Sequence, residues 1–550
     1  MIAPCPAETT VPKNSRRPVL AACPNPCNNT TPGSVAQAFQ PVLEAVHRLE
    51  SLCHFPAIAG AIFMALCLPA MAGVTPQPAI APDKTVETSN ASILRVNSTD
   101  QAYDFLRPWT KKAPFSRRGL GTLIEGGRIL VTAELVANNT FIELEKAGTA
   151  EKSSATVERV DYECNLAVLR PADPAFIAGM KPMALDRGVR VGDRATVLQL
   201  EPNGEIAQTL GIVTSIAVGA YPLDNMGLLL FRLSAPMQQR DGSFTLPAVR
   251  DGKLLGLLMR YDARSQTADL ISSPVIEHFL GEAAKGNYGG FARAGIAFSA
   301  TRDPQLRRFI GLKEPGGVYV TDVLTGGAAD KAGLRKGDVI LAVGGKAIDQ
   351  DGNYEDPAFG RIAFSHLTNT VSHPGDTLAF RVFREGKTLE IPVKMEPRDH
   401  SKILSESYVV DRAPRYIVLG GVVFMELSRP YLQEWGGDWV KEAPQRLVFY
   451  DAFQNELPQD RDKIVFISQI LPSQDTIGYE GLDNLVVSKV NGREIRNLND
   501  LAEAAKHPVN GFQKIELEAD PGVLFLDAAA IEANREKLIK KYALPALQRL

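Results

Sequence analysis

Cysteine is scarce in this 550-residue chain, and its placement excludes a disulfide framework. Five of the six cysteines lie within the first 67 residues, which leaves Cys164 alone in the rest of the chain. A single cysteine forms no internal disulfide, so the remainder of the protein must be stabilised by burial. The sequence also lacks the cysteine and histidine spacing of a zinc site and the glycine-rich loop of a phosphate site. We therefore expect no metal and no cofactor.

An excess of charge of either sign is also missing. The formal net charge is -3 at pH 7, which gives no electrostatic reason to expect nucleic acid as a partner. Apolar residues make up 45% of the chain and charged residues 22%, a balance typical of a folded soluble protein. The length of the chain suggests three or four domains, since one domain usually has roughly 100 to 200 residues.

Long apolar runs are absent except for one near the N-terminus. Residues 55–68 form an apolar stretch that follows Arg48 and ends at Ala70-Met71-Ala72. This order is typical of a signal peptide, so we expect a leader over residues 1–72 that is cleaved after Ala72. The stretch is short for a membrane span, and an uncut anchor helix is the alternative. Export of a chain with so few cysteines favours the periplasm or the cell surface of a bacterium.

Composition divides the rest of the chain into a linker and a β-rich region. Residues 73–97 are rich in proline, threonine, alanine and serine, which predicts a flexible linker. From residue 98 to about residue 267, short β-type runs such as GRILVTAEL and NLAVLRP alternate with glycine, asparagine and aspartate turns. This pattern predicts an all-β barrel or sandwich. A helix is expected to follow in SPVIEHFLGEAAKG.

Two later segments repeat each other at a constant offset of 147 positions. VYVTDVL at residues 318–324 matches VFISQIL at residues 465–471, and AVGGKAI further on matches KVNGREI. A strand, a connection and a strand-turn-strand thus recur, which indicates an internal repeat of a domain of about 100 residues. The polar segment at residues 397–408 marks the break between the two copies.

The first copy resembles a PDZ domain of the HtrA/Deg family of serine proteases. The resemblance rests on GGAADKAGLRKGDVILAVGGKAI and on YGGFARAGIAF upstream of it. In such domains the second stretch is the loop and strand that bind the carboxylate of a peptide C-terminus. The resemblance therefore implies a peptide site at Gly295, Ile296, Ala297 and Phe298.

The other wall of this groove is expected to be a helix over residues 360–371. Phe364 and Leu367 have helical spacing there, and they either line the groove or serve as ordinary core residues. His366 on the same segment is expected to face the solvent.

The resemblance extends from about residue 100 to the C-terminus. The second copy is divergent, with YEGLDNL in place of AGLRKGD, and resembles the second PDZ domain of plant-type Deg proteases. The implied fold is mainly β. It has a chymotrypsin-like double β-barrel at residues 98–285, a PDZ domain at residues 286–400 and a divergent PDZ domain at residues 408–550. The family also forms trimers or larger cages, and it degrades or holds misfolded proteins.

This family uses a triad of histidine, aspartate and serine, and all three positions are altered here. RILVTAELVA resembles the strand and turn that bear the histidine, and Glu134 stands in its place. CNLAVL puts Asn165 at the aspartate position. In QQRDGSFTLP the serine position falls on Phe244 or Gly242, depending on the direction of alignment, and Ser243 lies between them.

The chemistry makes these changes severe. A serine hydroxyl is a weak nucleophile until a base of near-neutral pKa takes its proton, and a glutamate of ordinary pKa is too weak a base. His278, the one histidine of the barrel region, matches a structural residue of the family rather than its base. We therefore predict no catalytic residues.

The predicted function is that of an exported pseudoprotease that binds peptide C-termini or unfolded protein segments. It would act as a scaffold or in protein quality control, alone as a trimer-based homo-oligomer or together with an active Deg relative. Two alternatives are left open. One is a working endopeptidase that uses Ser243 with a non-standard base, and the other is a purely structural envelope protein.

Overall fold

The computed structural model describes residues 91–550 except 147, 148, 150, 202–204, 224, 225, 239–242, 456, 458 and 459. For Ser243 and Phe244 it describes the backbone but not the side chains. The predicted leader, most of the predicted linker and Gly242 therefore lie outside the described residues. Within the described ranges, no helix is long and apolar enough to cross a membrane.

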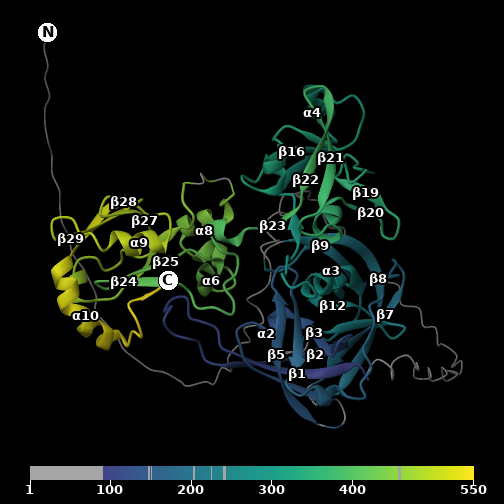
Figure 1. Ribbon diagram of the computed structural model, residues 1–550, viewed down its shortest axis with the longest axis horizontal. Coiled ribbons are helices and arrows are strands. Elements are labelled where there is room, and N and C mark those ends of the chain that lie inside the picture. Colours follow the sequence, from purple (N-terminus) through teal and green to yellow (C-terminus); the bar gives the residue numbers. More distant parts are fainter. Residues whose placement is uncertain are drawn as a thin grey trace, which may run out of the picture. The chain divides into compact units, whose positions relative to one another are not determined.

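The first barrel closes six strands in the order β1-β4-β5-β6-β3-β2, because β1 pairs with both β4 and β2. Strands β1, β2, β3 and β5 of this barrel are labelled in Figure 1. The short strand β10 adds to β2 in parallel. The elements are β1 (Ile93–Asp100), β2 (Phe115–Ile124), β3 (Arg128–Thr132), α2 (Ala133–Val136), β4 (Asn139–Lys146), β5 (Lys152–Asp161), β6 (Leu166–Pro171), η3 (Pro174–Ile177) and β10 (Ser243–Phe244).

The start of β1 corrects the predicted linker. Residues 93–97 were expected to belong to the linker, but they form the first half of β1 and pair with β2 and β4. The linker prediction is therefore wrong for these five residues, which are part of the barrel wall.

The second barrel is also closed, in the order β11-β12-β13-β9-β8-β7. The helix α3 follows its last strand and contacts β9, β12 and β13. The elements are β7 (Arg194–Leu200), β8 (Ile206–Ala220), β9 (Gly227–Ser234), β11 (Pro247–Arg250), β12 (Lys253–Asp262), β13 (Thr267–Ser272) and α3 (Ser273–Ala283).

Alternate residues of the central strands serve two cores. In β3, Ile129 and Val131 fill the first barrel, whereas Leu130 packs into a core that includes side chains of the second barrel. Strand β6 divides its side chains in the same way. Successive side chains of a strand point to opposite faces, so a strand between two cores is apolar at every position. This explains the unbroken apolar runs that marked these strands in the sequence.

The first PDZ domain has a sheet in the order β15-β16-β17-β21-β22, with β18 paired to β17. Two separate two-stranded sheets, β14 with β23 and β19 with β20, lie outside this sheet. The elements are β14 (Ala292–Arg293), β15 (Ile296–Ala300), α4 (Pro304–Ile310), β16 (Val318–Val323), α5 (Ala328–Ala332), β17 (Val339–Val343), β18 (Lys346–Ala347), β19 (Asn353–Asp356), β20 (Gly360–Ala363), η4 (Leu367–Val371), β21 (Thr377–Arg384), β22 (Lys387–Lys394) and β23 (Glu396–Pro397), followed by η5 (His400–Lys402).

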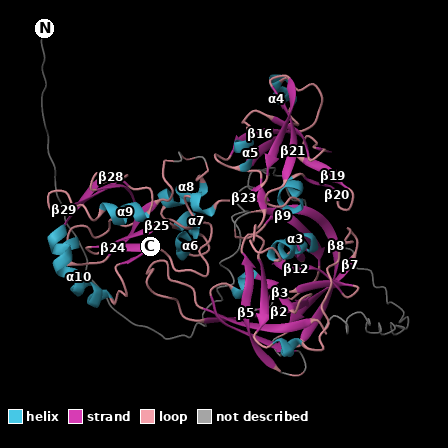
Figure 2. Ribbon diagram, viewed as in Figure 1, coloured by secondary structure: helices cyan, strands magenta, loops and turns pink. Residues whose placement is uncertain are grey.

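The second PDZ domain repeats this sheet with additions, in the order β30-β29-β27-β26-β25-β24-β31. Helices α6 to α8 are inserted between β25 and β26, and α10 precedes the last strand (Figure 2). The elements are β24 (Tyr416–Leu419), β25 (Val422–Glu426), α6 (Arg429–Leu432), η6 (Gln433–Trp435), α7 (Trp439–Glu442), α8 (Gln445–Ala452), β26 (Val465–Ile470), η7 (Gln474–Thr476), β27 (Leu485–Val490), β28 (Arg493–Glu494), α9 (Leu498–Ala504), β29 (Phe512–Leu517), β30 (Val523–Asp527), α10 (Ala528–Tyr542) and β31 (Gln548–Arg549).

Candidate functional site

Glu134 and Asn165 meet at the end of one strand pair. Strands β3 and β6 are antiparallel, with Thr132 opposite Leu166, so residues just after β3 lie beside residues just before β6. The main-chain N–H of Glu134 donates to Oδ1 of Asn165 over 3.0 Å, and Nδ2 of Asn165 donates to Oε2 of Glu134 over 3.3 Å. The structure therefore brings two of the predicted positions together through two hydrogen bonds, one to the Glu134 main chain and one to its carboxylate.

Arg117 of β2 also contacts Glu134. Its guanidinium donates to the main-chain carbonyl of Glu134 and, over 3.4 Å, to the carboxylate of Asp100. Burial raises the pKa of the Glu134 carboxyl, while the Arg117 charge and the Asn165 hydrogen bond act in the opposite direction. The net rise favours the protonated acid over the carboxylate more than in a free glutamate.

The segment predicted to hold the nucleophile runs as a strand. β10 pairs in parallel with β2, with Phe244 opposite Gly119. Thr245, the next residue, is buried and has a φ of +50°, a conformation that is uncommon outside glycine. The Thr245 hydroxyl oxygen lies 2.5 Å from the Thr132 hydroxyl oxygen and accepts the Thr132 N–H over 3.0 Å. The polar contacts of Thr245 therefore tie this segment to the end of β3.

The predicted peptide loop contains a glycine in a left-handed conformation, followed by a strand. Gly295 has a φ of +74°, and its carbonyl accepts the Leu324 N–H over 2.9 Å. A Cβ at Gly295 would lie 3.3 Å from Cβ of Leu324, so a larger residue would be strained in both conformation and space. Beyond it, Ile296, Ala297 and Phe298 lie on β15. This strand pairs with β16 on one side, and no described strand pairs with its other side.

Aromatic side chains link β15 to the opposite wall. The ring centroids of Phe298 and Phe364 are 5.0 Å apart, and Phe298 is 38% exposed whereas Phe364 is buried. Leu367 is partly buried and packs against the same core cluster as Phe364. Of Phe298, Phe364 and Leu367, Phe298 is thus the one that offers substantial surface to a ligand.

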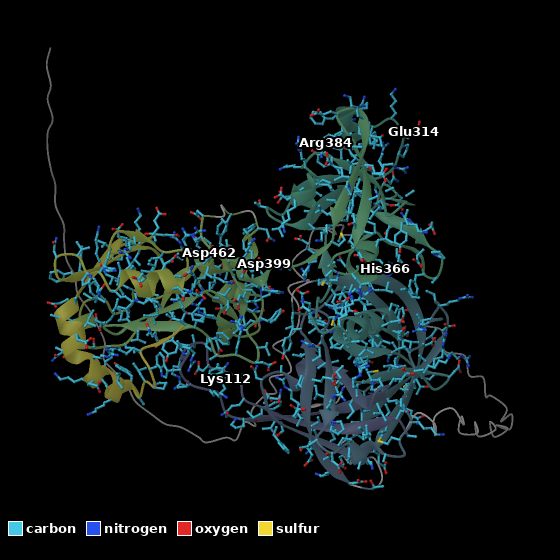
Figure 3. All side chains as sticks on the ribbon, in the orientation of Figure 1. Lys112, Glu314, His366, Arg384, Asp399 and Asp462 are labelled. Carbon is cyan, nitrogen blue, oxygen red and sulfur yellow. The ribbon has the colours of Figure 1, made fainter. Side chains whose placement is uncertain are left out.

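The helix predicted over residues 360–371 is wrong in its first part. Residues Gly360–Ala363 form β20 and pair with β19, and helical structure begins only after Phe364. The predicted exposure of His366 is also wrong. Its side chain, labelled in Figure 3, is buried, and its Nδ1 lies 2.7 Å from the Tyr354 hydroxyl. Burial lowers the pKa of His366, so its ring is held neutral as a core residue.

Comparison with known proteins decides the family. The PDZ domain family matches residues 293–395 and again residues 406–548. Protease Do-like 2, chloroplastic, of Arabidopsis thaliana is 28% identical over 463 residues, which cover 83% of this chain and 74% of that protein. Putative protease Do-like 3, mitochondrial, of the same plant is 26% identical over 459 residues, 83% of this chain and 79% of its own. The chain belongs to the HtrA/Deg family.

A solved HtrA-type structure was also found. The HtrA-type protease AlgW with decapeptide covers 57% of this chain and 98% of its own, at 19% identity and a TM-score of 0.44.

In the HtrA/Deg pattern G-N-S-G-G-P, the alignment from Pro247 places Thr245 and Leu246 at the two glycines after the serine. The left-handed φ of Thr245 is what a glycine would adopt there without strain.

Sequence reasoning gave no role to an acidic pair at the end of β5 and just after it. Asp161 and Glu163 are both buried. Asp161 accepts the Tyr288 hydroxyl and, over 2.7 Å, the Glu163 N–H. Glu163 pairs with Arg293 over 3.1 Å and with His400 over 3.0 Å. These partners lie more than 100 residues away in sequence, so no local signal could have found them.

Proposed function

We propose that this chain is a catalytically inactive HtrA/Deg homologue that binds peptide C-termini or unfolded protein segments through its first PDZ domain. It would serve as a scaffold or in protein quality control. The reciprocal pairing of Glu134 with Asn165 carries the proposal of inactivity. The Asn165 amide donates to the Glu134 carboxylate and accepts from the Glu134 main-chain N–H, across the place where the family holds an imidazole and its orienting aspartate.

The serine segment supports the same conclusion. An oxyanion hole needs main-chain N–H groups that point at the developing charge. Here β10 is engaged in sheet pairing with β2, and the Thr245 carbonyl accepts the Leu120 N–H over 3.2 Å. A strand that uses its backbone for the sheet is a poor scaffold for such a hole.

A fluorophosphonate probe tests this proposal directly. We expect no labelling of the full-length protein at neutral pH under conditions that label trypsin completely. Labelling that disappears in Ser243→Ala would instead establish the rival, an active endopeptidase. A Glu134→Gln variant of the same chain would then show whether Glu134 is its base, because glutamine keeps the Asn165 hydrogen bond but accepts no proton.

The two PDZ copies differ in the edge at which a peptide could add. In the first copy, β15 has β16 on one side only among the described strands. In the second copy, the corresponding strand β25 is already paired with β24, and β24 is in turn paired with the C-terminal strand β31. Peptide addition needs an open strand edge. This difference supports a ligand site in the first copy, at Gly295 to Phe298.

The N-terminal leader gives a further prediction. We propose that residues 1–72 are removed on export and that the protein works in the periplasm or at the cell surface, as a trimer-based assembly or with an active relative. Cleavage after Ala72 would leave β1 intact, since β1 starts at Ile93. Mass spectrometry of protein from the native source should find Gly73 at the N-terminus. An intact leader in the membrane fraction would favour the anchor instead.

A further inference from the structure

Three groups that can bind metals meet beside helix α3, which follows the last strand of the second barrel. His278 and Glu282 lie one turn apart on this helix, so their side chains share one face. His373, from the segment after η4, stacks on His278 with ring centroids 4.2 Å apart and ring planes 6° apart. One ligand atom from each of the three residues lies within 4.8 Å of the other two.

The hydrogen bonds of His278 leave one of its ring nitrogens without a matching partner. Its Nδ1 lies 2.9 Å from the carbonyl oxygen of Thr370, and its Nε2 lies 3.1 Å from the carbonyl oxygen of Gly290. A carbonyl oxygen only accepts, and a neutral imidazole has a single N–H. One nitrogen of a neutral His278 therefore turns its lone pair toward an oxygen lone pair, an arrangement that a cation placed between them would relieve.

A second proton is a poor candidate for that cation. The His278 ring is stacked on a second imidazole, so protonating both rings would place two like charges face to face. A metal ion avoids this conflict because it is bound by neutral imidazoles.

The surrounding donors match what a zinc-type ion uses. Two imidazole nitrogens and one carboxylate are a common ligand set for zinc, which adds a fourth ligand to complete a tetrahedron. The Glu282 carboxylate is buried, and its Oε1 lies 2.5 Å from Nδ1 of His373. A ligating histidine usually donates its other N–H to a carbonyl, as Nε2 of His278 can do to Gly290.

We propose that His278, Glu282 and His373 form a binding site for a zinc-type divalent metal ion, with the Thr370 carbonyl beside it. The site would join α3 to the first PDZ domain. Two local movements complete it. The ring of His373 is 39% exposed, which leaves it room to turn its nitrogen toward the ion. The Lys285 ammonium, which pairs with Glu282 from a half-exposed side chain, would swing into the solvent.

The sequence does not reveal this site because its three ligands are not close together along the chain. His278 and Glu282 are four residues apart, but His373 follows 91 residues after Glu282. Spacing rules find zinc sites whose ligands lie in short motifs, and this arrangement forms only when the first PDZ domain packs against α3. The expectation that the chain binds no metal was drawn from such motifs alone.

The test is a titration of chelator-stripped full-length protein with Co²⁺ and Zn²⁺, followed by calorimetry and visible absorption. Five N-terminal cysteines could also bind these ions, so the quantity to compare is the difference between variants. We expect His373→Ala and Glu282→Gln to bind one ion fewer per chain than the parent. The ion that they lose should show Co²⁺ ligand-field bands without thiolate charge-transfer absorption. His507→Ala is the matched control, because the His507 side chain is exposed and pairs with Glu503 at 3.5 Å, away from the proposed site. It should keep the parent stoichiometry.

A second variant keeps the test decisive if the ligand variants fold poorly. Lys285→Ala removes a competitor for Glu282 on the surface, so it should tighten binding of that ion severalfold. Equal stoichiometry in the parent and His373→Ala would overturn the proposal. An unchanged affinity in Lys285→Ala together with unfolded ligand variants would also overturn it.

Discussion

Replacing Phe298 by aspartate is expected to weaken the binding of apolar C-terminal peptides by on the order of a hundredfold, which corresponds to about 3 kcal/mol. Phe298 lies on the open edge strand β15, and its ring packs against Phe364 while 38% of its surface stays exposed. A peptide added along β15 would cover this ring. The substitution removes that apolar contact and obliges the ligand to desolvate a charge.

The measurement is a titration of full-length protein with a library of C-terminal peptides, for which we expect micromolar affinity, about -8 kcal/mol. Phe309→Asp is the matched control, because Phe309 belongs to the same domain but lies on α4 with 87% of its surface exposed. It should bind as the parent does. Leu367 is less suitable as a target, because it packs against the core and a charge there could unfold the domain. Equal affinities of the parent and Phe298→Asp would remove the ligand site from β15.

The fold could be predicted because its motifs are local. The turn GDVILAVGG is a short stretch, and so is each of the segments that recur at an offset of 147 positions. The structure places the recurring segments in corresponding strands of the two PDZ domains. The start of the barrel was missed for a physical reason. In β1 the alternation of buried and half-buried residues holds from Leu94 onward, but two of the buried positions are the polar residues Ser98 and Asp100. The apolar alternation ends after Val96, because the next buried positions are polar, so the hydrophobic period is too short to mark a strand and residues 93–97 were assigned to the linker.

The candidate site could be predicted only in part. Glu134 and Asn165 were found because each stands in a recognisable strand motif, and antiparallel pairing of β3 with β6 joins them. The exposure of His366 was predicted wrongly because its partner Tyr354 lies on β19. Nothing in the sequence of residues 360–371 predicts the β19–β20 hairpin. Clusters that join distant segments are fixed by tertiary packing, which spacing along the chain does not encode.

Asp161 should make the barrel more stable at low pH, and Asp161→Asn should remove this effect. Burial, and then the Glu163 charge, raises the pKa of Asp161 from 3.8 to about 6. The folded state therefore prefers the neutral acid. The stabilisation is fully present below about pH 4 and is lost as pH rises through the folded pKa of about 6. This rise of the Asp161 pKa from 3.8 to about 6 corresponds to about 3 kcal/mol of folding free energy.

Hydrogen exchange of β5 and β6, measured by mass spectrometry between about pH 4 and pH 7, reports the free energy of opening next to this carboxyl. In the parent this free energy should fall by about 3 kcal/mol relative to Asp161→Asn over that range. Asparagine can still accept the Glu163 N–H, so any loss that does not depend on pH cancels in the comparison.

Asp262→Asn provides a control of opposite sign. A hydrogen bond from the exposed Ser265 hydroxyl lowers the pKa of Asp262, so its contribution is lost only as pH falls below the ordinary range of an aspartate. The free energy of opening of this variant should change with pH as that of the parent does, from about pH 4 to pH 7. If the parent and Asp161→Asn run parallel over the same range, Asp161 is ionised in the folded state. Tyr288 and the two main-chain N–H groups would then stabilise the carboxylate more than burial opposes it.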